Sequence, residues 1–333
     1  MYIKADRILS GITGGAINSA QLQTLLADPG YLGAFRSGIL YSPPRRDVLL
    51  ASPQAAAVVA GSSLAVGELL VKSPVITAAL ADSAWFSSLV SSPLAAPLIY
   101  ANATGIAALF GADRKAVFAP HAAQVTLTGS EASIWRNYVG SVHLYGGGAG
   151  AQPTFNGQAA GEFTTLAFDG VNDILSAGPA GLFAAATSTF YFVVRPTAMT
   201  SSRVWIAEGG PGGGYIGSSA TSGVLFGSTG GTYNFAGNQP IANTWQLYRL
   251  RKDAGGPWYV KRNSAAELSA GAVAFSAAQQ PLLVGHHSSG ANVPEMFFAG
   301  QIAEIINLGK SAGDADADNI RITELLRVKY ALW

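Results

Sequence analysis

The chain has 333 residues, enough for two domains of ordinary size. Charged residues make up only 12% of it, about half the usual share, and hydrophobic residues make up 49%. The net charge of +1 creates no basic field for nucleic acid, so we expect no nucleic-acid partner. The absence of cysteine excludes disulfides, thiolate catalysis and metal sites that need sulfur.

The first residues and the long uncharged runs bear on export and membrane insertion. Asp6 and Arg7 stand where a secretory signal would need its apolar region, so we expect no export signal. The uncharged runs 48–67 and 83–112 are interrupted by proline and by many serines. Neither offers about twenty continuous apolar residues, so we predict no membrane span.

Residues 1–48 are predicted to be an N-terminal docking segment. Ser19 can cap a helix that carries Leu22, Leu25 and Leu26, and the sequence Asp-Pro-Gly at 28–30 ends this helix. Residues 30–48 contain consecutive prolines and arginines and are predicted to form an irregular connector or docking surface.

Residues 49–122 are predicted to be a region of short helical repeats and a linker. A small polar residue recurs about every ten residues, at Ser52, Ser62, Ser73, Ser83, Ser92 and Asn102. Each is followed by an alanine-rich stretch that closes on an apolar pair such as Leu69 and Leu70. Because serine and asparagine can accept a hydrogen bond from a free amide at a helix start, each unit is predicted to be a helix of about two turns.

This repeat region is almost uncharged: between residues 49 and 112 the only charged residues are Glu68, Lys72 and Asp82. Helices this short are marginal alone and gain their stability from packing. We therefore expect an array that stacks on itself and on other copies or another protein. The alternative is an alanine-rich helical hairpin inside one globular domain.

From residue 123 onward the sequence favours β-structure. Short β-rich runs lie between turn signals, which predicts a two-sheet antiparallel sandwich. These runs are 164–168, 189–194, 203–207, 223–226, 244–250, 258–261, 281–284 and 296–307. Run 189–194 is apolar at successive positions, as in a strand covered on both faces, whereas Leu166 and Phe168 share one face of run 164–168.

The chain ends in a predicted helix over residues 318–332. Asp318 lies near its positive end, and Arg327 and Lys329 lie near its negative end, which suits the helix dipole. Its apolar stripe is predicted to comprise Ile322, Leu325, Leu326, Tyr330 and Trp333. The fold class is thus multi-domain α + β, with a short-helix array, a β-sandwich and a closing C-terminal helix.

Several segments in a fixed order resemble concanavalin A-like, or laminin-G-like, jelly-roll domains. These are SIWRN at 133–137, QPT at 152–154, LAFDGVND at 166–173, TWQLY at 244–248 and FAGQIAEII at 298–306. The resemblance covers 123–333 and implies a jelly roll whose last helix passes through Leu325, Lys329 and Tyr330. It is specific for the fold and not for a function.

The repeat region in turn resembles the serine- and alanine-rich short repeats of bacteriophage tail and fibre proteins. Together the two resemblances imply a virion structural or receptor-binding protein that assembles in the host cytoplasm and is then exposed extracellularly. The implied partners are other virion proteins, copies of itself, with a trimer among the options, and a host-surface polysaccharide or glycan. The alternatives are a secreted carbohydrate-binding adhesin and a polysaccharide-degrading jelly-roll enzyme.

The sequence favours a protein that is not an enzyme. Glucanases of the resembled fold carry a Glu-x-Asp-x-Glu strand with paired carboxylates, and this chain contains no such triplet. Glu304 is the nearest candidate, and a single acid lacks the required partner. We expect Glu304 to be a structural carboxylate, and the enzyme alternative requires a second carboxylate beside it.

Two sets of residues are candidate sites. Trp258, Tyr215 and Tyr233 follow glycine-rich turns, where their rings could stack on a saccharide; the alternative is that each ring packs beside its own loop. Asp169, Asn172 and Asp173 offer oxygen ligands for calcium. The alternative is that these three residues build tight turns, and no other cofactor is expected.

Overall fold

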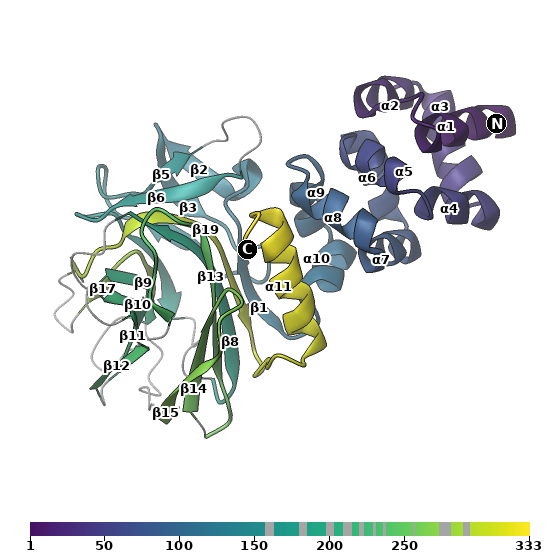
Figure 1. The fold of residues 1–333 in the computed structure, drawn as a ribbon. Coiled ribbons are helices and arrows are strands. Elements are labelled where there is room, and N and C mark those ends of the chain that lie inside the picture. Colours follow the sequence, from purple (N-terminus) through teal and green to yellow (C-terminus); the bar gives the residue numbers. More distant parts are fainter. Residues whose placement is uncertain are drawn as a thin grey trace. The chain divides into compact units, whose positions relative to one another are not determined.

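The computed structural model describes the chain except residues 157–162, 180–184, 198–202, 209–214, 220–222, 229–230, 236–237, 256, 273–280 and 289–293, and it leaves out some further side chains, including those of 223–228 and 231–235. Two compact units are present: Met1–Ala112 with Arg321–Ala331, and Asp113–Ile320 with Leu332–Trp333 (Figure 1). The predicted segments 1–48 and 49–122 thus lie mostly in one unit, the helical unit, which also takes up most of the C-terminal helix.

The helical unit is built from short helices in close succession. They are α1 (Tyr2–Thr13), α2 (Ser19–Leu26), α3 (Pro29–Gly33), the π-helix η1 (Ala34–Leu40), α4 (Pro43–Leu50), α5 (Pro53–Ala60), α6 (Ser63–Val71), α7 (Ser73–Ala81), α8 (Ser83–Ser91), α9 (Ala95–Ala101) and α10 (Ala103–Phe110). The C-terminal α11 (Ala317–Lys329) follows after the β-strands.

The repeat from α5 to α10 has a regular ten-residue period. In all six helices the side chains at positions ending in 5, 6, 9 and 0 are buried. Ser52, Ser62, Ser92 and Asn102 accept amide hydrogen bonds at the helix starts, which confirms four of the predicted caps. The other two predictions are wrong by one residue, because Lys72 and Asp82 occupy the cap positions instead of Ser73 and Ser83.

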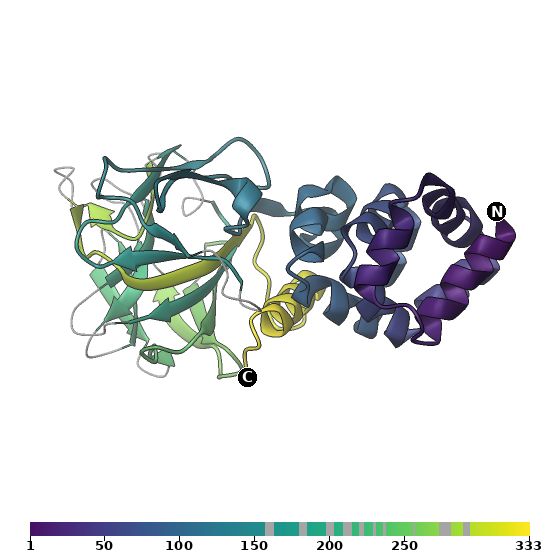
Figure 2. The same ribbon diagram turned by 90° about the horizontal axis from the view of Figure 1, so that it is seen from above.

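Helix junctions thirty residues apart lie against each other. The Ser92 hydroxyl donates to the carbonyl of Ala60 at 2.6 Å, and the hydroxyls of Ser73 and Thr104 are 3.2 Å apart. Helices three places apart pack together, α5 with α8, α6 with α9 and α7 with α10. Three helices therefore make about one turn of a superhelix. The repeat is the indigo-to-blue part of the helical unit in Figure 2. The array stacks on itself, as its nearly uncharged sequence predicts.

Helix α11 extends this array although it is more than 200 residues away in sequence. Arg321 Nε donates to the carbonyl of Leu109, near the end of α10, at 2.9 Å. Lys329 Nζ lies 3.2 Å from the Tyr100 hydroxyl. Ile322, Leu325 and Leu326 are fully buried, as predicted, whereas Trp333 is exposed and lies outside the stripe. Arg321–Ala331 thus belongs to the helical unit, whereas the family resemblance implies a closing helix of the jelly roll.

Two local predictions in the first 48 residues are wrong. The cap of α2 is Asn18 and not Ser19, because Asn18 and Gln21 form a reciprocal capping box. Residues 30–48 are largely helical and not irregular. Asp28 caps α3, and proline occupies the first turn of both α3 and α4, where its missing amide costs nothing.

The second unit, the β unit, is an antiparallel sandwich. Its strands are β1 (Arg114–Phe118), β2 (Val125–Thr128), β3 (Glu131–Trp135), β4 (Leu144–Gly146), β5 (Thr154–Asn156), β6 (Thr165–Asp169), β7 (Leu175–Pro179), β8 (Ser188–Pro196), β9 (Arg203–Glu208), β10 (Tyr215–Ser219), β11 (Gly223–Ser228), β12 (Gly231–Phe235), β13 (Gln246–Lys252), β14 (Pro257–Arg262), β15 (Leu268–Ala272), β16 (Pro281–Val284) and β19 (Ala299–Leu308). A 3-10 turn, η2 (Ala122–Gln124), precedes β2, and β17 (His287–Ser288) pairs with β18 (Pro294–Glu295).

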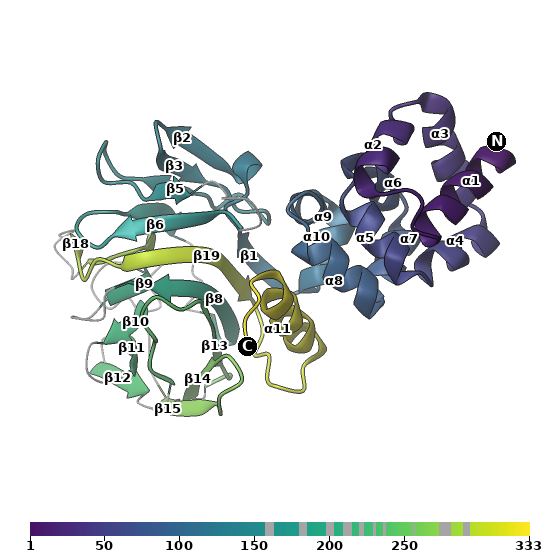
Figure 3. The same cartoon turned by 45° about the horizontal axis from the view of Figure 1, so that its top comes forward.

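The strands form two layers. In the first layer β19 lies between β8 on one side and β6 and β1 on the other (Figure 3), and β13, β14 and β15 follow β8. In the second layer the order is β2, β3, β4, β7, β16, β9, β10, β11, β12. The core between the layers includes Phe190, Trp205 and Trp258. This pairing confirms the predicted sandwich.

All eight predicted strand runs are strands, and the strands missed are mainly short or polar ones such as β4 and β5. The central strand β8 is buried at seven successive residues, and Leu166 and Phe168 of β6 both enter the core, as predicted. Among the described residues no single helix is long and apolar enough to cross a bilayer. In the part of the chain that the structure describes, one bent pair, α5 and α6 at 107°, meets the length and composition criteria together.

Candidate functional site

Trp258 is not an exposed ring. It lies in β14, has no exposed surface, and stacks on Phe190 in the core with ring centroids 6.5 Å apart. The expectation of a partly exposed Trp258 is therefore wrong, because the alternation of β14 turns this residue inward beside Val260. A ring without accessible surface cannot stack on a sugar in this conformation.

The two predicted tyrosines fall on neighbouring parts of the second layer. Tyr215 begins β10 and is half-buried, and its ring packs on a small cluster formed by Val204, Ala207 and Leu283. Tyr233 pairs with Phe226 in the backbone register of β12 and β11, and its side chain lies outside the described part of the chain. Both remain predictions as ligand contacts.

The registers of the second layer place Tyr215 in one row with a tyrosine that the sequence analysis missed. Tyr215 is opposite Ala207, which is opposite Leu283 on β16. The row continues through Ser176 on β7 to Tyr145 on β4. Their strand neighbours Ile216, Leu282 and Leu144 enter the core, so this row lies on the outer face of the layer. Four strand spacings separate the tyrosines by about 19 Å.

Tyr145 lies at the open end of this row. Its side chain is 50% exposed, whereas Ala207 is fully buried and Leu283 is 7% exposed. Beyond it the row reaches Ile134 on β3, which is half-buried. Ser176, Tyr145 and Ile134, here called the Tyr145 face, form an accessible surface with an aromatic ring at its centre. A ring with an apolar face and a polar hydroxyl suits contact with a saccharide.

Asp169, Asn172 and Asp173 are brought together in a turn after β6. Asp169 Oδ1 accepts the amides of Val171 at 2.7 Å and Asn172 at 3.2 Å. Asp173 Oδ2 accepts the amide of Asp169 at 2.6 Å, and the Asn172 side chain donates to the carbonyl of Gly150. These hydrogen bonds show that the three residues stabilise the turn. Within the described ranges no three His, Asp or Glu side chains gather as a metal site, and calcium here stays a prediction.

Because Asp173 is buried, its contribution to the unfolding free energy depends on pH. Burial raises the pKa of its carboxyl to about 6, against the lowering effect of the Asp169 amide, and the charges of Asp169 and Glu131 raise it further. The folded state therefore prefers the protonated acid, and the contribution of Asp173 to stability falls as pH rises from about 4 to about 6. We therefore expect the unfolding free energy of Asp173→Asn minus that of wild type to rise between about pH 4 and pH 6 and to stay constant above that.

Urea unfolding of both proteins at several pH values measures this difference. Subtracting the two curves removes the acids common to both proteins. Asp28→Asn, at an exposed helix cap, is the matched surface control for the substitution itself. A flat difference for Asp173→Asn between pH 4 and 6 would contradict the raised pKa.

Glu304 lies inside the protein and not on an accessible surface. It has no exposed surface and sits in β19 beside a bulge, opposite Val193 of β8. Burial raises the pKa of the nearby Tyr138 hydroxyl, and the charge of Glu304 raises it further. Tyr138 in turn shares a hydrogen bond with His121. This environment favours the structural interpretation of Glu304, because a substrate cannot reach a fully buried carboxylate.

No protein-family model and no curated protein matches this sequence. Among solved structures, domain 4 of AbnA, a GH43 extracellular arabinanase from Geobacillus stearothermophilus in complex with arabinotriose, is 15% identical, with a TM-score of 0.45, over 64% of this chain and 98% of that domain. A Trypanosoma rangeli sialidase in complex with the inhibitor DANA is 13% identical, with a TM-score of 0.41, over 63% of this chain and 32% of the sialidase.

A third similar structure is the Ruminococcus gnavus IT-sialidase CBM40 bound to alpha2,3 sialyllactose. It is 12% identical, with a TM-score of 0.35, over 41% of this chain and 83% of that domain. At these identities the likeness concerns the fold alone. The strand order and core described above define the β unit as an antiparallel β-sandwich. The phage-repeat resemblance of the helical unit has no support from these comparisons and stays a prediction.

Proposed function

We propose that this chain is a non-enzymatic virion structural protein of the bacteriophage tail or fibre type. Its helical unit docks into an assembly with other virion proteins and with copies of itself. Its β unit contacts a host-surface glycan through the Tyr145 face, on the outside of the particle. Several copies acting together would raise avidity although each site binds weakly.

The surface of the helical array is the observation that supports docking. Each of the three charged residues between 49 and 112 already interacts with another group of the same chain. Glu68 is buried and bonded twice by Arg36, Asp82 caps α8, and Lys72 lies 3.4 Å from the centre of the Tyr41 ring. The outward positions of the helices are mainly small and uncharged, as at Ala57, Thr77 and Ala78. Depletion of charge is typical of the centre of protein interfaces.

A glycan array tests the β-unit half of this proposal. We expect wild-type protein to bind host-surface polysaccharides and Tyr145→Ala to bind them roughly tenfold more weakly, because loss of a central aromatic contact typically costs more than 1 kcal/mol. Tyr41→Ala removes a ring of similar exposure, 47%, from the helical unit and is the control. Light scattering on the same samples should give a mass of more than one chain.

The alternatives give different results in the same experiment. Equal binding by Tyr145→Ala and wild type would exclude the Tyr145 face as the contact. Release of reducing ends from a bound polysaccharide would favour the degrading enzyme. A monomeric mass at high protein concentration, combined with tight glycan binding, would favour the secreted adhesin.

A further inference from the structure

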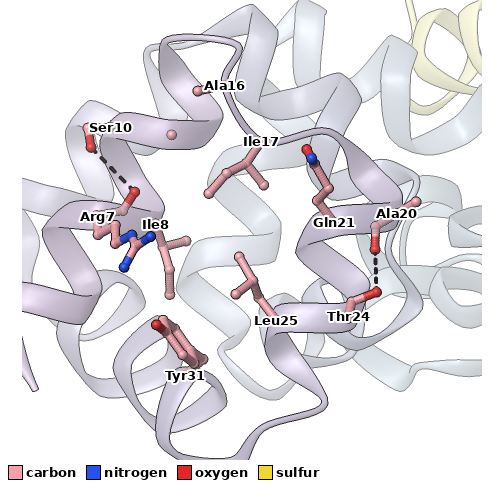
Figure 4. Close-up of a pocket in the computed structure, with 11 residues that line it drawn as sticks. Arg7, Ile8, Ser10, Ala16, Ile17, Ala20, Gln21, Thr24, Leu25 and Tyr31 are labelled. Atoms are coloured by element: carbon pink, nitrogen blue, oxygen red, sulfur yellow. Dashed lines mark hydrogen bonds between the residues drawn. The ribbon is translucent and has the colours of Figure 1, made fainter.

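A cavity of about 740 Å³ lies in the helical unit between α1, α2 and α3. Figure 4 shows its walls, with the aliphatic side chains of Ile8, Ile17 and Leu25 pointing into the hollow. Arg7 and Tyr31 lie at its edge. Small residues such as Ala20 complete the wall and leave the space open. The volume falls within the range of small-molecule sites in proteins.

The polar side chains of the wall offer few hydrogen bonds to a ligand. The Ser10 hydroxyl donates to the carbonyl of Arg7, and the Thr24 hydroxyl donates to the carbonyl of Ala20. The side-chain oxygen of Gln21 accepts the amide of Asn18 in the capping box. The wall is mostly solvent-exposed and gives a sugar or nucleotide few directed hydrogen bonds, whereas Ile17 and Leu25 offer apolar contact. The hollow therefore suits an aliphatic chain.

Arg7 supplies a positive charge at the edge of this cavity. Within the described ranges its guanidinium makes no ion pair or side-chain hydrogen bond. The other arginines of α1–α6 are paired, Arg36 with Glu68, Arg45 with Asp6 and Arg46 with Asp47. A guanidinium binds a carboxylate through two parallel hydrogen bonds. The edge is thus complementary to a single carboxylate.

The size of the cavity argues against a partner helix as its occupant. A helix with its side chains is about 10–12 Å wide and rises about 5.4 Å per turn, so one turn fills roughly 400–600 Å³. The cavity holds little more than one such turn, which is too short to be stable. An extended peptide would bring in backbone groups that find no partners on this wall.

We propose that this cavity binds an amphiphile with an unbranched aliphatic chain and one carboxylate. The chain lies against Ile17 and Leu25 above the buried Ile8, and the carboxylate bonds to Arg7. This site is separate from the Tyr145 face and does not depend on the glycan or virion proposals.

Calorimetric titration of the full chain with decanoate, below its micelle-forming concentration, tests the site. We expect one decanoate per chain, bound roughly tenfold more tightly than decanol, because the hydrogen bond to a charged group is lost in the alcohol. Decylamine should bind more weakly still, since its charge repels Arg7. Each methylene added from octanoate to decanoate should tighten binding by about fourfold.

Variants separate this site from general binding to apolar surface. Arg7→Gln should reduce decanoate affinity to that of decanol, whereas Arg46→Gln, outside the cavity, should leave it unchanged. Ala20→Trp fills the cavity and should abolish binding of decanoate and of decanol. If circular dichroism shows that Ala20→Trp misfolds, Thr24→Trp is the second cavity-filling variant.

The proposal is overturned if decanoate does not bind the folded wild-type protein. It is equally overturned if a folded Arg7→Gln variant and a folded cavity-filling variant both bind decanoate as wild type does. Loss of glycan binding in other experiments has no effect on this result.

Discussion

Leu325→Ala is expected to loosen α9 and α10, although more than 200 residues separate it from them. Leu325 is fully buried in the part of α11 that belongs to the helical unit. Replacing a buried leucine by alanine costs about 2–5 kcal/mol of unfolding free energy. Amide hydrogen exchange in peptides of α9 and α10 should accelerate on the order of a hundredfold, since α11 bonds to both helices.

The same helix provides a matched control. Ile320 is 57% exposed, so Ile320→Ala should change the unfolding free energy by less than about 0.5 kcal/mol. Exchange in the core strand β8 should be unaffected in both variants if the two units unfold separately. Unchanged exchange in α9 and α10 of Leu325→Ala would show that α11 does not stabilise the array.

This dependence has a practical consequence for assembly experiments. A fragment that ends near residue 122 lacks Arg321–Ala331, and with it the side chain that bonds to the carbonyl of Leu109. It also leaves apolar surface of the last helices uncovered, which favours aggregation. Association of such a fragment would not report on the native docking surface, so assembly should be measured on the full chain.

Trp258→Ala is expected to destabilise the β unit by about 3–5 kcal/mol, a large part of the stability of a typical domain. The residue is fully buried between the two layers, and its ring stacks on Phe190. Urea unfolding followed by far-ultraviolet circular dichroism measures the loss. Any loss of glycan binding in this variant should follow the unfolded fraction.

Tyr145→Ala is the matched comparison for Trp258→Ala. Its exposed ring contributes little to packing, so its unfolding free energy should stay within about 0.5 kcal/mol of wild type. The two variants thus separate loss of fold from loss of contact. A Trp258→Ala protein that kept wild-type stability and lost glycan binding would restore Trp258 as a binding residue.

The helical repeat was predictable in detail because its signals are local. A capping side chain, two buried positions after it and an apolar pair recur within each ten residues. The errors at Ser73 and Ser83 arose because serine follows the true cap position and resembles a cap itself. The prolines of residues 30–48 suggest a connector in the sequence, although at the first turn of α3 and α4 proline suits a helix.

The candidate site was less predictable. Trp258 and Tyr215 both follow glycine-rich segments and look equivalent in sequence, yet one ring is in the core and the other packs on the outer face. Tyr145 carried a weak signal, since it stands in a three-residue strand before a glycine run. Its place in the row depends on the registers of five strands, β10, β9, β16, β7 and β4.

The amino-acid sequence alone determined the short capped helices, the runs that become strands and the terminal helix, because each depends on neighbours within about one or two helical turns or one strand. Only the tertiary structure decided that α11 joins the helical array, that Trp258 faces inward, and that Tyr145 stands in a row with Tyr215. These outcomes depend on which distant segments pack together, and burial of apolar surface between such segments leaves no local mark in the sequence.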